Sequence, residues 1–150
     1  MHCITSAELL LRNPDDAIKK RRVEFEALMR ELSSLADLEI SYVQFRRLLR
    51  DERTVGSFLV ADNDSMQGLA VATYIVTSLG DVMWIQDIVV TSALRRKGFG
   101  AMLVKHLMQQ SKSSNFEIEK WVLDTRPERD VGGFYEALGF QRLSVDRYYL

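Results

Sequence analysis

The sequence predicts an α/β (α+β) domain with a mixed, mostly antiparallel sheet and helices on both of its faces. Two helical stretches come first in the 150 residues, and three strand-like runs follow them. After these runs come a helix, a strand, a second helix and a last strand. The prolines are Pro14 and Pro127, and no Gly/Ser-rich linker or internal repeat divides the chain. We therefore expect residues 1–150 to form a single domain.

The composition excludes several classes of protein. Lys and Arg number 20 and Asp and Glu number 21, so a net charge of -1 gives no positive field for nucleic acid or an anionic membrane. With the one cysteine Cys3 and the histidines His2 and His106, we expect no disulfide and no metal site. No apolar run suits a membrane span or the core of a signal peptide. We therefore expect a cytoplasmic protein without nucleic-acid or membrane partners.

The first long helix is expected to begin at Asn13-Pro14. Asparagine is a favoured N-cap and proline a favoured first helical residue, and two aspartates follow near the positive end of the helix dipole. Apolar side chains then recur on one helical stripe, at Ile18, Phe25, Leu28, Met29 and Leu32. The helix should run to about Ser33. The basic residues 19–22 lie largely off the stripe, and we interpret them as a solvated face.

Two shorter elements flank that helix. A second helix is indicated by the N-cap candidate Ser41, which apolar residues follow at helical spacing. Residues 3–5 carry only a faint strand signal, so a first strand that is short or absent stays open.

Three runs rich in β-branched and aromatic residues follow, at 54–61, 69–79 and 82–91. The sequence Asp-Asn-Asp-Ser at 62–65 is typical of a turn, so the first two runs predict a hairpin. Gly80 and its neighbour Asp81 indicate the turn before the third run. These runs supply the antiparallel part of the sheet.

The C-terminal part alternates between helices and strands. A Ser/Asn-rich stretch at 111–115 ends the next helix, and Gly139 is expected to close the last one as its C′ residue. The expected elements are a helix over 98–112, a strand over 120–125, a helix over 130–138 and a strand over 140–150.

The segment Arg-Arg-Lys-Gly-Phe-Gly at 95–100, the 95–100 loop, lies between a predicted strand and an amphipathic helix. The N–H groups in the first turn of a helix have no intrahelical acceptor, so such a helix end binds anions. Glycines at 98 and 100 leave room for an oxyanion, and three cations add positive charge. Neither a Walker loop nor a dinucleotide fingerprint is present. The loop predicts a diphosphate site, with an ordinary strand-to-helix turn as the alternative.

The sequence resembles the GCN5-related N-acetyltransferases (GNAT) in three segments that occur in the family's order. RRKGFG matches the family's Gln/Arg-x-x-Gly-x-Gly/Ala loop, QDIVVTSALRR looks like the strand before it, and GGFYEALGF is similar to the family's Phe-Tyr-x-x-Leu-Gly-Phe helix end. With the hairpin upstream, the resemblance spans about 54–140. It implies the family's fold, in which two central strands splay apart, and acetyl-CoA as cosubstrate.

The resemblance also implies which residues hold the coenzyme. In the family the loop's N–H groups cradle the diphosphate, and here the side chains of Arg95 and Arg96 would add charge. The pantetheine arm pairs with exposed backbone of the preceding strand near a bulge, where the Ile88 N–H would stabilise the oxyanion on the acetyl carbonyl. The implied coenzyme-binding positions are Ile88, Val89, Val90, Arg95, Arg96, Lys97, Gly98, Phe99, Gly100 and Ala101.

Two groups would move protons. Tyr135 matches the family's tyrosine that protonates the leaving thiolate, and a core tyrosine on the apolar stripe with Phe134 is the alternative. An attacking amine must first lose a proton. Several branches carry a glutamate where this chain has Gln86, and the neighbouring Asp87 replaces it only if a bulge re-aims it. Asp87 as base, a water chain without a dedicated base, and a paired structural role for Asp87 stay open.

These features predict an N-acetyltransferase whose amine acceptor attacks the thioester directly in a ternary complex. Because no acidic or basic tract would hold a charged peptide, we expect a small-molecule amine. The alternatives are an amino-sugar phosphate, a protein amine, and a non-catalytic acyl-CoA-binding module, and a homodimer stays open. Candidate acceptor-binding residues are Tyr74, Trp84, Gln86 and Arg126. Tyr74 and Trp84 also suit the core, Arg126 also suits an ion pair, and His106 is expected at the surface.

Overall fold

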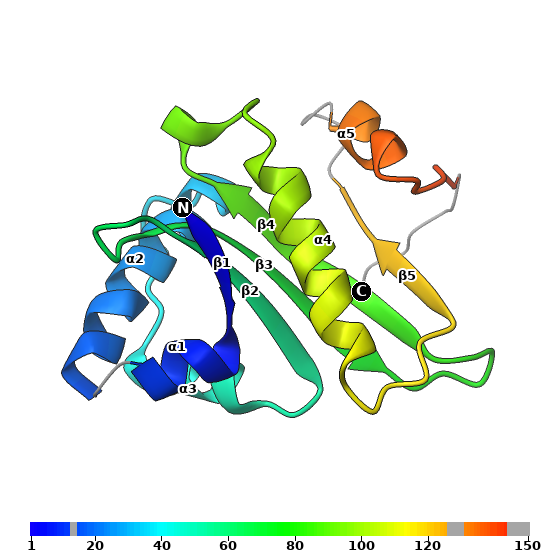
Figure 1. The fold of residues 1–150 in the computed structure, drawn as a ribbon, viewed down its shortest axis with the longest axis horizontal. Helices are drawn as coiled ribbons and strands as arrows, with labels where there is room; N and C mark the ends of the chain where they lie inside the picture. The colour runs from blue at the N-terminus through cyan, green and yellow to red at the C-terminus, as the bar shows by residue number, and fades with distance from the viewer. Residues whose placement is uncertain (13–14, 126–130, 144–150) are drawn as a thin grey trace.

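The structure, a computed structural model, describes residues 1–12, 15–125 and 131–143 (Figure 1). In the described part of the chain, one sheet contains the strands in the order β1-β2-β3-β4-β5. Neighbours from β1 to β4 are antiparallel, and β4 and β5 are parallel. The elements are β1 (His2–Thr5), α1 (Ser6–Arg12), α2 (Asp15–Ser33), α3 (Tyr42–Arg50), β2 (Thr54–Val60), β3 (Met66–Ile75), β4 (Val82–Val90), the 3₁₀ helix η1 (Ser92–Leu94), α4 (Phe99–Lys112), β5 (Lys120–Leu123) and α5 (Gly132–Ala137). The predicted fold class is confirmed.

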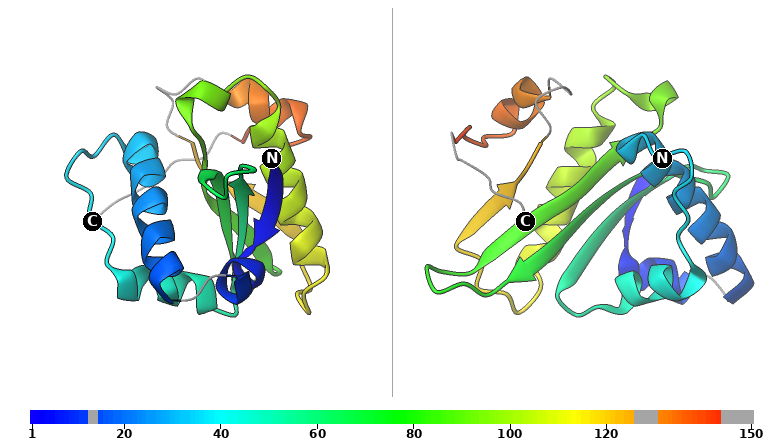
Figure 2. Two further views of the ribbon diagram at one scale, coloured as in Figure 1. Left: turned by 60° about the vertical axis from the view of Figure 1, so that its left-hand side comes forward. Right: turned by 180° about the vertical axis from the view of Figure 1, so that it is seen from behind.

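Helices cover both faces of the sheet (Figures 1 and 2). Helices α1, α2 and α3 enclose one apolar layer, in which Phe25 and Phe45 meet at 5.0 Å between ring centroids. Helix α4 encloses the other layer, with Leu103 and Leu107 fully buried against β2, β3 and β4. Burial of these stripes is the main stabilising contribution. The two layers also make the face of each β4 side chain identifiable.

The N-terminal segment contains more structure than the sequence indicated. The faint signal at 3–5 corresponds to β1, which pairs with β2 along its length. Helix α1 was not predicted, although Thr5 and Glu8 form a reciprocal cap: the Glu8 N–H donates to Thr5 Oγ1 at 3.1 Å and the Thr5 N–H to Glu8 Oε2 at 2.8 Å. Helix α2 is described from Asp15 and ends at Ser33, as expected, while the expected start at Asn13-Pro14 lies outside the described residues.

The basic residues 19–22 are not a solvated face throughout. The side chain of Arg21 is 2% exposed, and its guanidinium lies 2.9 Å from Glu24 and 2.5 Å from Asp64. Arg22 donates to the Ile40 carbonyl at 2.8 Å. Arg21 stands three residues after Ile18 and four before Phe25, so helical spacing places it on the buried stripe, and its long stem lies along the protein there. Arg21 therefore fixes α2 to the turn between β2 and β3.

Several expected boundaries shift: β3 begins at Met66 rather than 69, and β5 ends at Leu123 rather than 125. Strand β3 ends at Ile75 rather than 79, because the Gly80 N–H donates to the Thr77 carbonyl at 3.3 Å in a turn where Gly80 has φ 105°. Helix α5 begins at Gly132, and Gly139 follows its end with φ 92°, which confirms its predicted C′ position. Residues 140–143 form no strand, and 126–130 and 144–150 lie outside the described residues.

Candidate active site

Strand β4 carries a bulge at Gln86. Val71 of β3 pairs with Asp87, whereas the next residue, Ala72, pairs with Ile85, so Gln86 is an extra residue without a partner in the register. The β4 side chains that pack on the α4 layer are Met83, Ile85, Ile88 and Val90. Their numbers change from odd to even at the bulge, so the register shift exchanges the faces of the residues that follow.

The bulge brings Asp87 to the same sheet face as Trp84. Trp84 pairs with Thr73, Asp87 pairs with Val71, and Val71 lies in the layer beneath α1, α2 and α3. Strict alternation would place residues 84 and 87 on opposite faces. Gln86 reaches this face as well, because Thr73 Oγ1 donates to Gln86 Oε1 at 3.1 Å. The orientation that Asp87 needs to replace a glutamate at position 86 is therefore present.

Asp87 is half-buried, and its surroundings favour the protonated carboxyl. Burial raises the pKa of Asp87 above its ordinary value. Among residues 1–12, 15–125 and 131–143, no cation or hydrogen-bond donor pairs with its carboxylate. The charged form thus loses hydration without gaining a partner in that part of the molecule.

Strands β4 and β5 pair only at one end. Their register runs from Val82 opposite Lys120 to Ile85 opposite Leu123. Strand β4 continues to Val90, and no strand in the described ranges pairs with its edge beyond Ile85 on the β5 side. Figure 1 shows β5 continuing toward α5 while β4 leads into η1. The predicted separation of two central strands is therefore present along Ile88, Val89 and Val90. The side chain of Ile88 is half-buried, and those of Val89 and Val90 are buried.

The first turn of α4 has the geometry expected of an anion site. Gly98 is the N-cap with φ 84°, and no side chain of the described residues caps the helix. The Met102 N–H donates to the Gly98 carbonyl at 3.1 Å, so the N–H groups of the preceding turn are those that a helix end leaves without an intrahelical acceptor. A Cβ atom on Gly98 would meet no atom within 4 Å, so the space beside it is open.

The three cations of the 95–100 loop differ in their partners. Arg95 Nη2 contacts Glu31 Oε2 at 2.8 Å, and Arg95 Nε donates to the Val90 carbonyl at 3.1 Å. Arg96 and Lys97 are exposed and form no ion pair with any residue of the described ranges. Arg96 also has φ 60°, which is unusual for a residue other than glycine. Within the described ranges, two of the cations thus have no ion-pair partner, and the third is engaged by the protein.

Helix α5 holds Tyr135 beside this turn. The Phe134 ring packs at Gly100 of α4, and the Tyr135 ring meets Phe134 edge-to-face at 5.0 Å and Phe140 at 6.0 Å. Tyr135 is half-buried among these rings. Figures 1 and 2 show α5 next to the end of α4 at which Gly100 lies.

The proposed acceptor-binding residues are not all brought together. Trp84, which is 39% exposed, shares a face with Gln86, whereas Tyr74 packs on the opposite layer. The Tyr74 ring stacks on Phe116 at 4.4 Å, and its hydroxyl donates to Asp81, a hydrogen bond that raises the pKa of Tyr74. Arg126 lies outside the described residues.

The structure corrects the expectation that His106 lies at the surface. His106 is half-buried, and its Nδ1 is 2.8 Å from the hydroxyl of the fully buried Ser57. Burial lowers the pKa of His106. His106 stands three residues after the buried Leu103, and this helical spacing is the sequence signal that indicates contact with the sheet.

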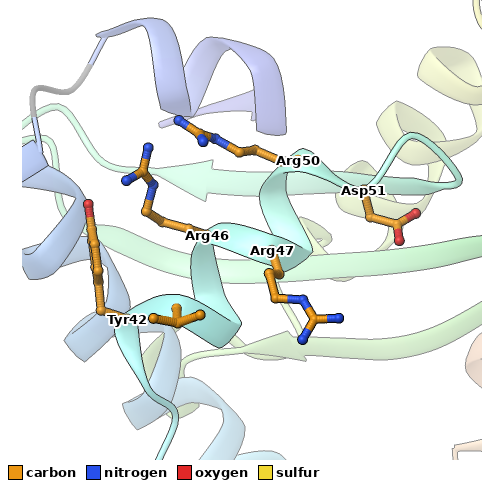
Figure 3. A pocket seen from close by; sticks show the side chains of 6 residues that line it. Tyr42, Arg46, Arg47, Arg50 and Asp51 are labelled. Atoms are coloured by element: carbon orange, nitrogen blue, oxygen red, sulfur yellow. The ribbon is translucent and has the colours of Figure 1, made fainter.

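A separate basic hollow lies on α3, lined by Tyr42, Val43, Arg46, Arg47, Arg50 and Asp51 (Figure 3). Arg46 lies over the Tyr42 ring at 5.5 Å and is 3.8 Å from Asp15. Helix α3 lies at the end of the sheet away from the first turn of α4 (Figures 1 and 2), so this hollow is not part of the site.

Two general features complete the description. Within the described ranges, no three side chains of His, Cys, Asp or Glu are grouped closely enough to hold a metal ion. None of the helices described has the length and apolar character needed to cross a membrane.

Comparison with known proteins gives a family for most of the chain. The family model described as an acetyltransferase (GNAT) domain matches residues 54–142, which include β2 to α5 and the 95–100 loop. No curated protein matched the chain in a sequence search.

Solved structures of several acetyltransferases resemble the whole fold. Glucosamine-6-phosphate N-acetyltransferase from Arabidopsis thaliana has a TM-score of 0.71 at 23% identity, covering 89% of this chain and 92% of that one. An aminoglycoside acetyltransferase from an uncultured soil metagenomic sample, in complex with sisomicin, has a TM-score of 0.74 at 13% identity, covering 99% of this chain and 94% of that one. An aminoglycoside N-acetyltransferase in complex with CoA has a TM-score of 0.70 at 18% identity, covering 88% of this chain and 89% of that one. At these identities the likeness concerns the fold.

Proposed function

Because the chain belongs to the GNAT acetyltransferase family, we propose that it transfers the acetyl group of acetyl-CoA to a primary amine of a small molecule. The observation that carries this proposal is the position of two features at one end of the sheet. One is the edge of β4 beyond Ile85, with which β5 does not pair, and the other is the first turn of α4, which no side chain of the described residues caps. Together they offer an extended backbone for the pantetheine arm and N–H groups for the diphosphate.

The coenzyme would be held chiefly by backbone. The N–H groups from Gly98 to Ala101 form the positive end of the α4 dipole, and Arg96 and Lys97 add charge that no carboxylate of the described residues neutralises. The backbone of Ile88, Val89 and Val90 would pair with the pantetheine arm. Acetyl-CoA supplies the thioester whose acyl carbon the amine attacks.

The chemistry needs one proton acceptor and one donor. As the amine nitrogen bonds to the acyl carbon, its proton passes to the Asp87 carboxylate directly or through water, and the Ile88 N–H stabilises the charge on the carbonyl oxygen. The carbon–sulfur bond then breaks, and the Tyr135 hydroxyl gives its proton to the leaving thiolate. The raised pKa of Asp87 supports its part, because a base works best when its pKa approaches the working pH.

The acceptor would bind over the face that carries Trp84, Gln86 and Asp87. Trp84 offers an exposed ring, and Gln86 accepts from Thr73 through Oε1, which leaves its amide N–H groups to donate. An aromatic surface beside an amide and a carboxylate suits a small ammonium compound with hydroxyl or ring substituents.

The test is release of free CoA thiol from acetyl-CoA in the presence of small primary amines, amino sugars, amino-sugar phosphates and peptides. Release with a small amine supports the proposal, and release with peptides alone contradicts the acceptor class. Coenzyme binding without release for any amine supports a non-catalytic acyl-CoA-binding module instead.

Gly98→Val, compared with a control variant, tests the role of the turn in CoA binding. Valine is strained at φ 84° and its side chain would project into the open space beside the turn, so CoA affinity should fall at least tenfold. Gly133→Ala is the control, because that glycine has open space and no positive φ. Equal CoA binding by Gly98→Val and Gly133→Ala would contradict the role of the turn.

A further inference from the structure

We infer that Glu31 is a positioning residue for the coenzyme site and acts through Arg95. The inference rests on the proposed function, since it concerns how the 95–100 loop is held for CoA. It assigns the Arg95 side chain to the protein rather than to the diphosphate, and it gives a role to a residue of α2 that no sequence motif includes.

The Arg95 guanidinium joins three parts of the molecule. Nη2 reaches Glu31 on α2, 64 residues away along the chain, at 2.8 Å. Nε donates to the carbonyl of Val90, the last residue of β4, at 3.1 Å. Arg95 itself is the first residue of the 95–100 loop. Two acceptors at different nitrogens fix the plane of a guanidinium, which a single contact would leave free to rotate.

The loop has a conformation that requires such support. Arg96, the next residue, is left-handed at φ 60°, and Gly98 is left-handed at φ 84°. A left-handed residue other than glycine is strained and persists where its surroundings hold it. The Glu31–Arg95 pair fixes the residue directly before Arg96, and thereby the direction in which the chain enters the first turn of α4.

The Glu31 carboxylate would weaken the binding of a nearby diphosphate if Arg95 did not pair with it. A carboxylate close to an anion site repels the ligand unless a cation intervenes. Arg95 neutralises Glu31, while Arg96 and Lys97, which pair with no carboxylate of the described residues, offer their charges to the ligand. The arrangement thus divides the cations into one that shapes the loop and two that attract the coenzyme.

The two roles of Arg95 predict opposite effects of one substitution. If Arg95 positions the loop, Glu31→Gln releases the guanidinium and weakens CoA binding. If Arg95 is a phosphate ligand, the same substitution frees it from a competing carboxylate and tightens CoA binding. The side chains of Glu31 and Arg95 are 39% and 51% exposed, so the expected effect is modest, about two- to fivefold.

The experiment measures CoA dissociation constants by calorimetry for the full chain, Glu31→Gln, Arg95→Gln, Arg95→Lys and the Glu31→Gln/Arg95→Gln double variant. Positioning predicts that each single variant weakens binding by a similar factor and that the double variant is no weaker than either single one. Arg95→Lys should resemble Arg95→Gln, because an ammonium cannot hold both acceptors in a fixed plane.

Lys97→Gln and Glu52→Gln complete the set. Lys97→Gln should reduce the dependence of CoA affinity on salt concentration, whereas Glu31→Gln should leave that dependence unchanged. Glu52→Gln removes the same charge from an exposed residue beside the end of α3 and should not weaken binding. Tighter or unchanged binding by Glu31→Gln, or additive losses in the double variant, would overturn the inference.

Failure of the proposed function gives a different result. If the unaltered chain binds no CoA, the proposed function fails, and amide hydrogen exchange of the ligand-free chain still tests the pair. Glu31→Gln should then speed exchange at residues 96–98 relative to Glu52→Gln. Equal exchange in the two variants would show that Glu31 does not hold the loop.

Discussion

The ring of Phe134 on α5 lies 3.3 Å from the place where a Cβ atom on Gly100 would stand. This is tighter than an ordinary van der Waals contact, so α5 approaches α4 as closely as the missing side chain permits. The sequence suggested that Gly100 leaves room for an oxyanion. The structure adds that Gly100 sets the position of α5, and with it the position of Tyr135.

Gly100→Ala should therefore displace α5. We expect a loss of about 1 kcal/mol in the free energy of unfolding and a larger fall in kcat than in CoA affinity, because Tyr135 moves with Phe134. Denaturant unfolding and steady-state kinetics measure both. Gly133→Ala on the same helix is the control, since its added methyl group meets no atom within 4 Å. Phe134→Leu in the Gly100→Ala background should restore part of kcat, and an unchanged kcat in Gly100→Ala itself would contradict the packing role.

Asp87→Asn tests the base. Because burial raises the pKa of Asp87, the acid limb of kcat/KM should lie above the ordinary carboxyl value of about 3.9. Asp87→Asn should lower kcat by roughly a hundredfold or more and remove that limb. Gln86→Glu in the Asp87→Asn background should recover activity, because residue 86 reaches the same face. A limb that persists in Asp87→Asn would favour a water chain without a dedicated base.

Tyr135→Phe tests the proposed acid. The substitution removes only the hydroxyl and keeps the ring contacts with Phe134 and Phe140. Turnover should fall by roughly a hundredfold, while acetyl-CoA affinity changes little. Equal losses of turnover and affinity would indicate a packing role instead.

His106→Gln tests the buried hydrogen bond to Ser57. Burial lowers the pKa of His106, so the unfolded chain binds more protons than the folded chain as pH falls below about 6.5. The stability contribution of neutral His106 is therefore present above that pH and is lost as pH falls toward the lowered pKa. His106→Gln should flatten the pH dependence of the free energy of unfolding in this window. His2→Gln, at an exposed position on β1, is the control, and equal pH curves for both variants would contradict the assignment.

Arg21→Met tests the contact between α2 and the turn after β2. Methionine keeps much of the apolar stem but removes the pairs with Glu24 and Asp64, so we expect a loss of about 2 kcal/mol in the free energy of unfolding. Lys20→Met, at an exposed neighbouring position, should change stability by less than about 0.5 kcal/mol. Thermal and urea unfolding distinguish the two, and equal stabilities would show that Arg21 is not a stabilising contact.

Local patterns in the sequence were sufficient for much of this molecule. The stripe of α2, the N-cap Ser41 and the C′ residue Gly139 each depend on neighbours within a few residues, and the structure places all three as expected. The loop at 95–100 and the turn of α4 follow from the same kind of information. Helix α1 was missed although its cap, Thr5 with Glu8, is also local.

Features that depend on distant residues could not be predicted. The buried charge of Arg21 is paired by Asp64, which is distant in the sequence, and Arg95 is engaged because Glu31 lies on α2. The face of Asp87 depends on where β3 and β4 change register, and alternation within β4 does not indicate that point. In each case the deciding partner is set by tertiary packing.

Strand β4 consists of two segments joined at Gln86, and the alternation of side chains between the sheet faces is reversed from one segment to the other. In a segment grafted from a protein without that additional residue, every side chain after position 86 would point to the wrong face. Its counterpart of Asp87 would then be driven into the apolar layer beneath α4, where an ionised carboxyl has no solvent. Alignments and redesigns of this chain should therefore be anchored separately before and after Gln86, as though the strand were two.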